Sequence, residues 1–177
     1  SFKMGGAVAQ LFGLVALRQA NAAVIPYDVP RYAQDLKGHF ANAVKNVQTI
    51  APDFAGFDQV DAALAKLEAS SAAYQNALNS ATEQGTVSSG KLAQINKGLI
   101  ALEKSWIDPK GMYYGDWYKS LYVCNDPFSG YASWILPGIQ YEVAIRNTGR
   151  LEEWDGRYAS AILDLSRKID QLTSHLK

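Results

Sequence analysis

Two long segments of the chain place mostly apolar residues at alternating spacings of three and four, and this pattern constrains the fold most. The first segment starts near Phe57 or Asp58, ends at Gln84-Gly85 and carries Val60, Leu64, Leu67, Ser71, Tyr74 and Leu78 at these spacings. The second carries Leu151, Tyr158, Ile162, Leu165, Ile169, Leu172 and Leu176 on one stripe. Such spacing gathers the apolar side chains on one face of a helix. Two long faces of this kind predict the seam of a helical bundle.

Shorter stretches of the same pattern predict three more helices. One runs from about Met4 to Ala23 and stops before Ile25-Pro26. The next begins at Pro30, where a missing N–H does no harm in the first turn, and ends at Ala51-Pro52-Asp53. A further helix carries Leu92, Ile95, Leu99, Leu102 and Trp106.

Between Ile107 and Pro137 the helical periodicity disappears, and glycines, prolines and aromatic residues take its place. We expect a long loop here, with one short strand over 118–123, followed by a short helix from Pro137 to Asn147-Thr148-Gly149. Loops of this length inside a compact domain usually have a function. The chain is therefore predicted to be all-α and a single domain over 1–177: about four long helices plus short ones, with one long aromatic-rich loop.

Composition excludes several classes of function. The 177 residues include 17 Lys and Arg against 17 Asp and Glu, which argues against electrostatic binding to nucleic acid or to an anionic membrane. The single cysteine, Cys124, excludes an internal disulfide framework and a structural Cys-based zinc site. Two histidines, His39 and His175, leave little for a histidine-rich metal centre.

The most apolar run, Gly5–Leu17, has 13 residues and is too short to span a bilayer, which needs about 20. With Lys3 before it and Ala20-Asn21-Ala22 after it, the run imitates a secretory signal. The alternative is a buried core helix, which we favour because polar residues interrupt and close the run. The chain opens with Ser1 rather than Met, so we expect it to be a piece of a longer protein.

Candidate catalytic and metal-binding residues are few. Glu152, Glu153 and Asp155 cluster ahead of the last helix, where acidic side chains are also favoured by the helix dipole. We expect them to be structural rather than catalytic. His39 and His175 have no plausible second ligand three or four residues away, so we expect no catalytic, metal-binding or cofactor-binding residue in this chain.

The aromatic loop admits two interpretations. Cys124 has no nearby histidine, so we expect it to pack rather than to act as a nucleophile. The aromatic side chains could stack bases, but only Lys110 and Lys119 lie among them, and core or interface packing explains them better. They are Tyr113, Tyr114, Trp117, Tyr118, Tyr122, Phe128, Tyr131 and Trp134.

Four segments, taken in order, carry a resemblance over nearly the whole chain. They are Gly5-Gly6-Ala7-Val8 with Val24-Ile25-Pro26-Tyr27-Asp28, then Leu102–Met112 with its Ile-Asp-Pro-Lys-Gly, then Trp117–Tyr122, and last Leu136-Pro137-Gly138-Ile139 with Tyr141-Glu142-Val143. This series resembles the C-terminal domain of the transferrin receptor and glutamate carboxypeptidase II family. The resemblance implies a transferrin receptor-like dimerisation domain.

The resemblance implies several properties beyond the fold. In this family the domain is the helical C-terminal part of a type II membrane protein and forms much of the homodimer contact. Its implied partners are a second copy and the protein's own protease domain, with no nucleic acid and no membrane contact by this domain. The implied location is the extracellular or endomembrane-lumenal side. The family's enzymes are zinc carboxypeptidases whose metal ligands lie in the protease domain, so zinc is expected there and not in this chain.

One candidate for substrate binding does fall within the chain. In the family's glutamate carboxypeptidases, a Lys-Tyr pair before the Pro-Gly-Ile motif holds the carboxylate of a C-terminal glutamate. Tyr131 matches the tyrosine, whereas Gly130 stands where the lysine would be, which puts glutamate preference in doubt. Three alternatives stay open: a module of an active zinc peptidase, a domain of a non-enzymatic receptor-like protein, or a free-standing helical-bundle ligand binder or inhibitor.

Overall fold

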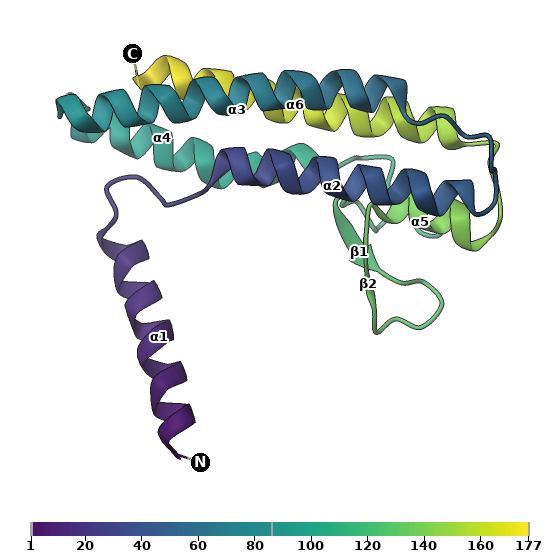
Figure 1. Cartoon of the computed structure of the whole chain (residues 1–177), viewed down its shortest axis with the longest axis horizontal. Helices are drawn as coiled ribbons and strands as arrows, with labels where there is room; N and C mark the ends of the chain where they lie inside the picture. The colour runs from purple at the N-terminus through teal and green to yellow at the C-terminus, as the bar shows by residue number, and fades with distance from the viewer. Residues whose placement is uncertain (1, 86, 177) are drawn as a thin grey trace.

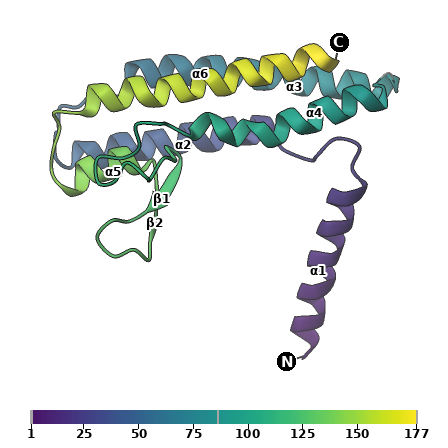
Figure 2. The ribbon, with the colours of Figure 1, turned by 180° about the vertical axis from the view of Figure 1, so that it is seen from behind.

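The computed structural model describes residues 2–85 and 87–176. Four helices lie alongside one another in a bundle: α2 (Val29–Gln48), α3 (Asp58–Gln84), α4 (Ser89–Ala101) and α6 (Leu151–Leu176) (Figure 1). Helix α1 (Phe2–Asn21) projects away from this bundle, and the view from behind shows the same separation (Figure 2). The predicted all-α class is confirmed, since the only sheet among the described residues has two short strands.

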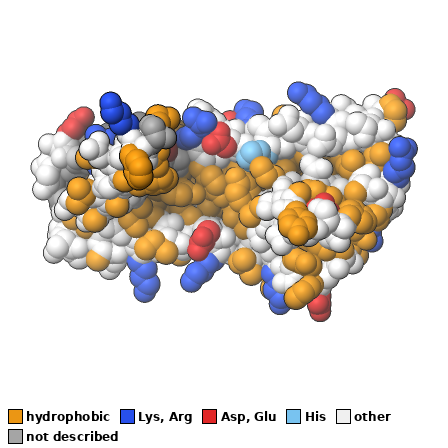
Figure 3. Space-filling view, turned by 90° about the horizontal axis from the view of Figure 1, so that it is seen from below, with side chains coloured by type: hydrophobic (Ala, Val, Ile, Leu, Met, Phe, Trp, Pro, Cys, Tyr) orange, Lys and Arg blue, Asp and Glu red, His pale blue; other side chains and the backbone are white. Residues whose placement is uncertain are grey.

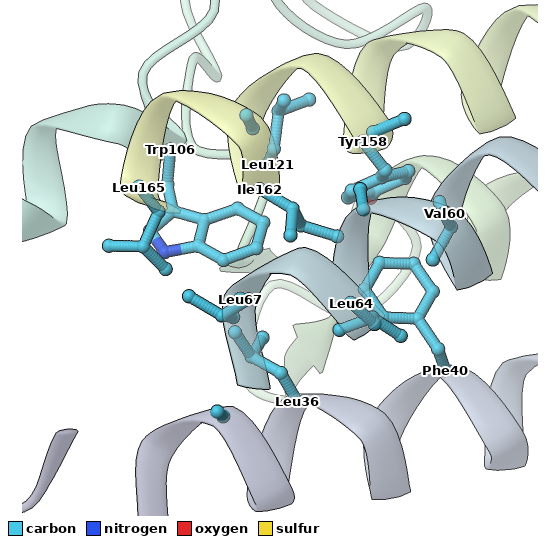
Figure 4. Close-up of a cluster of buried hydrophobic side chains, with 14 of the residues drawn as sticks. Leu36, Phe40, Val60, Leu64, Leu67, Trp106, Leu121, Tyr158, Ile162 and Leu165 are labelled. Atoms are coloured by element: carbon cyan, nitrogen blue, oxygen red, sulfur yellow. The ribbon is translucent and has the colours of Figure 1, made fainter. Parts of the chain in front are cut away.

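Helices α3 and α6 make the most extensive contact in the molecule and form the centre of the core. The two predicted stripes are the faces that meet: Val60, Leu64 and Leu67 of α3 are buried, as are Tyr158, Ile162 and Leu165 of α6. Figure 4 shows Leu36 and Phe40 of α2, together with Trp106 and Leu121, closing the same cluster. The predicted bundle seam is therefore confirmed.

Local interactions set the helix ends. Asp28 caps α2 by accepting a hydrogen bond from the amide of Arg31 at 2.9 Å, and Pro30 lies in the first turn as expected. Gly85 ends α3 in the left-handed conformation, with φ of 60°. Helix α2 ends at Gln48, a few residues before the expected Ala51-Pro52-Asp53.

The expected helix that carries Leu92 to Trp106 has two parts. It is α-helical as α4 and then tightens into the 3₁₀ helix η1 (Leu102–Trp106). The next region corrects the prediction of a strand over 118–123. The strands are β1 (Val123–Asn125) and β2 (Ser133–Ile135), which pair antiparallel with Cys124 opposite Trp134.

The residues just before β1 lie beside the end of η1 and are hydrogen-bonded to it. They do not form a strand. The amide of Leu121 donates to the carbonyl of Trp106 at 2.8 Å, and the amide of Asp108 donates to the carbonyl of Lys119 at 2.9 Å. These two bonds make an isolated antiparallel bridge between Ile107 and Ser120, and the pairing does not extend into a strand over 118–123. After β2, helix α5 (Pro137–Ala144) begins at Pro137 as predicted and ends three residues before Asn147.

The expectation of a buried core helix at the start of the chain is wrong within this chain. Helix α1 forms where the sequence predicts it, but none of its residues is buried. Its connection to the bundle is fixed by Asn96 of α4, whose side-chain amide donates to the carbonyl of Ala23 and accepts from the amide of Ile25, both at 2.9 Å. The helix is therefore an arm with a fixed root and an uncovered surface.

Candidate functional site

Tyr131 lies at the tip of the loop that joins β1 to β2, and this hairpin projects from the bundle on the same side as α1 (Figure 1). Its side chain is 99% exposed, the highest value among the large side chains of the loop. No side-chain hydrogen bond of the Tyr131 hydroxyl occurs among the described residues, so the hydroxyl is free to reach a ligand. The neighbouring Gly130 has φ of 71°, a backbone conformation that side-chain-bearing residues rarely adopt.

Asp126 organises the loop that presents Tyr131. Its carboxylate accepts hydrogen bonds from the amide of Phe128 and the hydroxyl of Ser129, both at 2.7 Å. The backbone closes the loop as well, because the amide of Gly130 donates to the carbonyl of Asp126 at 2.9 Å. The Ser129 hydroxyl and then the Phe128 amide lower the pKa of the Asp126 carboxyl below its usual value. The tip is thus a defined turn and not an irregular loop.

An aromatic stack supports the tip from the side of the bundle. The ring of Phe128 lies nearly parallel to that of Tyr141 of α5, with centroids 6.2 Å apart, and 5.9 Å from Trp134 of β2. Tyr141 in turn packs on Tyr114 at 5.0 Å. The expectation that the loop aromatics pack is met by these rings, which join the hairpin to α5.

A buried carboxylate that the sequence analysis did not single out holds the segment after this hairpin. Glu142 of α5 is 0% exposed and accepts hydrogen bonds from Asn147 at 2.7 Å and from Trp154 at 2.9 Å. Arg150 adds two more, at 2.8 and 2.9 Å. The pair of charges therefore fixes the turn between α5 and α6. The only sign of this network in the sequence is that one acid, one amide and one arginine lie close together along the chain.

A second cluster ties the start of the aromatic loop to α6. Arg157 forms an ion pair with Asp108 at 2.8 Å and donates to the carbonyl of Gly111. The hydroxyl of Tyr113 donates to Glu153 of α6. An open polar cleft of about 600 Å³ lies between this part of the loop and α6. Its lining carries as many acidic as basic side chains, and every acid just named is engaged in a contact within the chain.

Three further residues that the sequence singles out, Asp155, His39 and Cys124, take structural positions. Asp155 accepts from the amides of Gln59 at 3.1 Å and Val60 at 2.9 Å, so it caps α3 rather than its own helix. His39 packs against the ring of Tyr122. Cys124 is half-buried, and burial raises the pKa of its thiol, which disfavours the thiolate.

Over residues 2–85 and 87–176, no group of three acidic, histidine or cysteine side chains could hold a metal ion. In the same ranges, no helix is both long and apolar enough to cross a bilayer.

The side of the molecule that carries the hairpin and α1 exposes many apolar side chains. Figure 3 looks onto this side and shows hydrophobic side chains spread between the end of α1 and the hairpin. On the arm itself Leu11 and Phe12 are 61% and 69% exposed. An apolar groove of about 600 Å³ opens at the root of the arm and is lined by Val24, Leu78 and neighbouring residues. Exposed apolar surface of this extent marks an interaction surface.

Comparison with known proteins agrees with the fold. A probable glutamate carboxypeptidase, LAMP1, from Arabidopsis thaliana is 28% identical over 152 residues. The match covers 85% of this chain but 21% of the relative, so the chain spans about a fifth of the relative's length. The family model of the transferrin receptor-like dimerisation domain matches residues 55–170, which is more than half of the chain and runs from the start of α3 into the last turns of α6. The chain therefore belongs to the family of transferrin receptor-like dimerisation domains.

Proposed function

We propose that this chain is the dimerisation domain of a glutamate carboxypeptidase-like zinc peptidase and that it lends the tip of its hairpin to the substrate pocket of that enzyme. The observation that carries the proposal is the family itself, together with a relative named as a probable glutamate carboxypeptidase. In this proposal the chain performs no catalysis, and zinc and its ligands belong to another part of the whole protein.

Self-association is the first part of the proposal. The family model covers α3 to α6, which include three of the four bundle helices, while α1 and α2 lie outside the match. A homodimer built from the bundle should therefore not need α1. A twofold axis is the default symmetry for such a pair.

Light scattering on a dilution series tests this part. Two samples are compared, the whole chain and residues 23–177, because α1 contributes no buried residue and Asn96 still holds the chain at Ala23. We expect a mass near twice that of the chain, 19.3 kDa for the whole chain, to persist on dilution in both samples. A mass that falls to the monomer in residues 23–177 would show that association comes from the apolar arm instead.

Substrate contact is the second part of the proposal. Tyr131 is exposed at the tip of a hairpin that is held by Asp126 and by the Phe128 stack, so its hydroxyl can donate a hydrogen bond at a fixed place. A C-terminal carboxylate is an acceptor of the kind that such a hydroxyl binds. Because Gly130 provides no cation beside it, we expect a contribution from the hydroxyl alone.

Kinetics of the whole protein test this part. Tyr131→Phe removes the hydroxyl and keeps the ring, so we expect KM for a peptide with a C-terminal glutamate to rise about 3- to 10-fold, as for the loss of one hydrogen bond. Tyr27→Phe, at a tyrosine near the root of the arm, is the matched control and should leave KM unchanged. An unchanged KM in Tyr131→Phe removes the carboxylate role. Whole protein that contains no zinc and cleaves no such peptide favours the receptor-like alternative.

A further inference from the structure

The hairpin that carries Tyr131 is almost free of charge. Over residues 120–141, all of which the structure describes, Asp126 is the only charged residue, and it is an acid. The nearest cation before it is Lys119, whose carbonyl accepts a hydrogen bond from the amide of Asp108 and which therefore lies at the base of the hairpin. The tip itself projects from the bundle (Figure 1). Residues 120–141 therefore bring no positive charge to a ligand that meets the tip.

The large side chains that the hairpin exposes are apolar or aromatic. Phe128 and Tyr131, three residues apart at the tip, are 66% and 99% exposed. Val123 and Ile135 face each other across β1 and β2 and are exposed as well. The ring of Phe128 keeps its exposure while it stacks on Tyr141, so its place is fixed. A surface of apolar rings with one polar group, the hydroxyl of Tyr131, has the composition of a site for a mostly apolar ligand.

The carboxylate of Asp126 serves the loop and not a basic ligand. One of its oxygens accepts from the amide of Phe128 and the other from the hydroxyl of Ser129, both at 2.7 Å. A basic side chain of a ligand would have to compete with these two bonds. The negative charge stays in place, because the bonds from Ser129 and Phe128 lower the pKa of Asp126. A second carboxylate near the tip is therefore repelled.

We infer that the substrate of the proposed peptidase ends in an uncharged apolar or aromatic residue and not in glutamate. This inference rests on the proposed function, which places the tip of the hairpin in the substrate pocket. An acidic side chain at that place would lose water and lie near Asp126 without gaining a cation. An apolar side chain gains contact with the exposed ring of Phe128 and leaves the bonds of Asp126 intact.

The hydroxyl of Tyr131 then binds the main-chain carboxylate of the last residue. Every peptide carries this group, whatever its last side chain, and a neutral hydroxyl can donate one hydrogen bond to it. Tyr131→Phe should therefore raise KM by the same factor for a peptide that ends in phenylalanine and for one that ends in glutamate. A rise for the glutamate peptide alone would place the hydroxyl on the glutamate side chain and overturn the inference.

Cleavage of four peptides by the whole protein tests the substrate class. The peptides differ only in their last residue, which is phenylalanine, glutamine, glutamate or lysine. We expect kcat/KM for the phenylalanine peptide to exceed that for the glutamate peptide by about 10- to 100-fold, as for a charged group left without its hydrogen bond. Glutamine has the shape of glutamate without the charge, so its value should lie between the two.

Each other outcome of this comparison has a definite meaning. A glutamate peptide that is cleaved as fast as the glutamine peptide, or faster, overturns the inference. A lysine peptide that is cleaved faster than the phenylalanine peptide overturns it as well, because Asp126 would then recognise a basic end. Cleavage of none of the four removes the proposed function and the inference with it, whereas a preference for glutamate removes the inference alone.

A pair of substitutions at Gly130 tests whether the missing charge sets the preference. A Cβ at Gly130 would meet nothing within 4 Å, so a long side chain has room there. Gly130→Lys adds a cation, and Gly130→Met adds a side chain of similar length without charge. Both carry the same strain of the positive φ. We expect Gly130→Lys to raise the ratio of kcat/KM for the glutamate peptide to that for the phenylalanine peptide at least about 10-fold, while Gly130→Met leaves the ratio unchanged.

The ratio of two substrates in one sample does not depend on how much of the protein is folded, so partial loss of a variant leaves the test valid. Equal ratios in Gly130→Lys and Gly130→Met overturn the inference, because the added cation would then not reach the last side chain of the substrate. Asp126→Asn keeps the test decisive if neither variant folds, since asparagine also supports such turns. Loss of the negative charge should raise the same ratio by about 2- to 5-fold, and an unchanged or lower ratio overturns the inference.

Discussion

Replacement of Glu142 by glutamine should destabilise the bundle well beyond the usual effect of a Glu→Gln change. One carboxylate oxygen accepts from Asn147 and Arg150, and the other accepts from Arg150 and Trp154. A glutamine side chain keeps one acceptor oxygen and puts an NH₂ group in place of the other. Whichever way the amide turns, two donors then face a donor, and one of them is the guanidinium of Arg150.

The expected loss follows from these contacts. A hydrogen bond to a charged group contributes about 1.5–3 kcal/mol and a neutral one about 0.5–1.5 kcal/mol. One bond of each kind gives a loss of about 3 kcal/mol in the free energy of unfolding. Arg150 is 28% exposed, so water can solvate part of its charge, which keeps the loss below the upper end of the range for broken buried pairs. For a chain of this size, that corresponds to a fall in Tm of roughly 6–12 °C.

Urea unfolding followed by circular dichroism at the helix signal measures this loss. Glu152→Gln is the matched control, because Glu152 lies in the first turn of α6 and is exposed. It should change the free energy of unfolding by about 0.5 kcal/mol, the scale of an exposed helix-dipole contact. If the free energy of unfolding of Glu142→Gln falls by less than about 1 kcal/mol, or by no more than in the control, the hydrogen bonds of Glu142 do not stabilise the turn between α5 and α6 to the expected extent.

Three further predictions concern the same region. Gly138→Ala would put a Cβ 2.5 Å from the ring of the fully buried Trp154. The free energy of unfolding, measured in urea, should therefore fall by about 1–3 kcal/mol. An unchanged free energy of unfolding would contradict this close contact. The hydrogen bond from Ser129 lowers the pKa of Asp126, so the loop should stay ordered above the ordinary carboxyl pKa of 3.8. It should lose that order as pH falls through the lower pKa that Asp126 has in the folded chain. Amide shifts that stay unchanged down to about pH 2 in an NMR titration would contradict this. Burial raises the pKa of Cys124, so iodoacetamide at pH 8 should react more slowly with the folded chain than with the chain in urea, and equal rates would contradict it.

Much of the bundle could be predicted from periodicity, because α3 and α6 bury one continuous face each and their spacing records it. Gly85 marked the end of α3 for a local reason, since the left-handed conformation there favours glycine. The positions of the strands could not be predicted from the sequence, because they depend on how the segment before β1 is bonded to the end of η1. The bond from the amide of Leu121 to the carbonyl of Trp106 decides this, and no local pattern encodes it.

The candidate site was predictable only in part. Tyr131 was found through a resemblance and lies exposed at a hairpin tip, whereas its role in substrate binding stays a prediction. Glu142 was missed because an acid between tyrosine and valine looks like an exposed position, and its burial depends on donors that only the fold brings together. The burial of α1 was predicted from its apolar composition, and this prediction is wrong within this chain because none of the residues of α1 is buried.

The contact between α3 and α6 also has a consequence for how the chain is made. Helix α3 ends at Gln84 and α6 begins at Leu151, so during translation α3 leaves the ribosome before the helix that makes its most extensive contact has been made. At about 5–20 residues per second, roughly 3–13 s pass before α6 starts to appear. The face of α3 that packs on α6 therefore stays exposed for that interval, and a stop codon before Leu151 would yield a chain that cannot close its core.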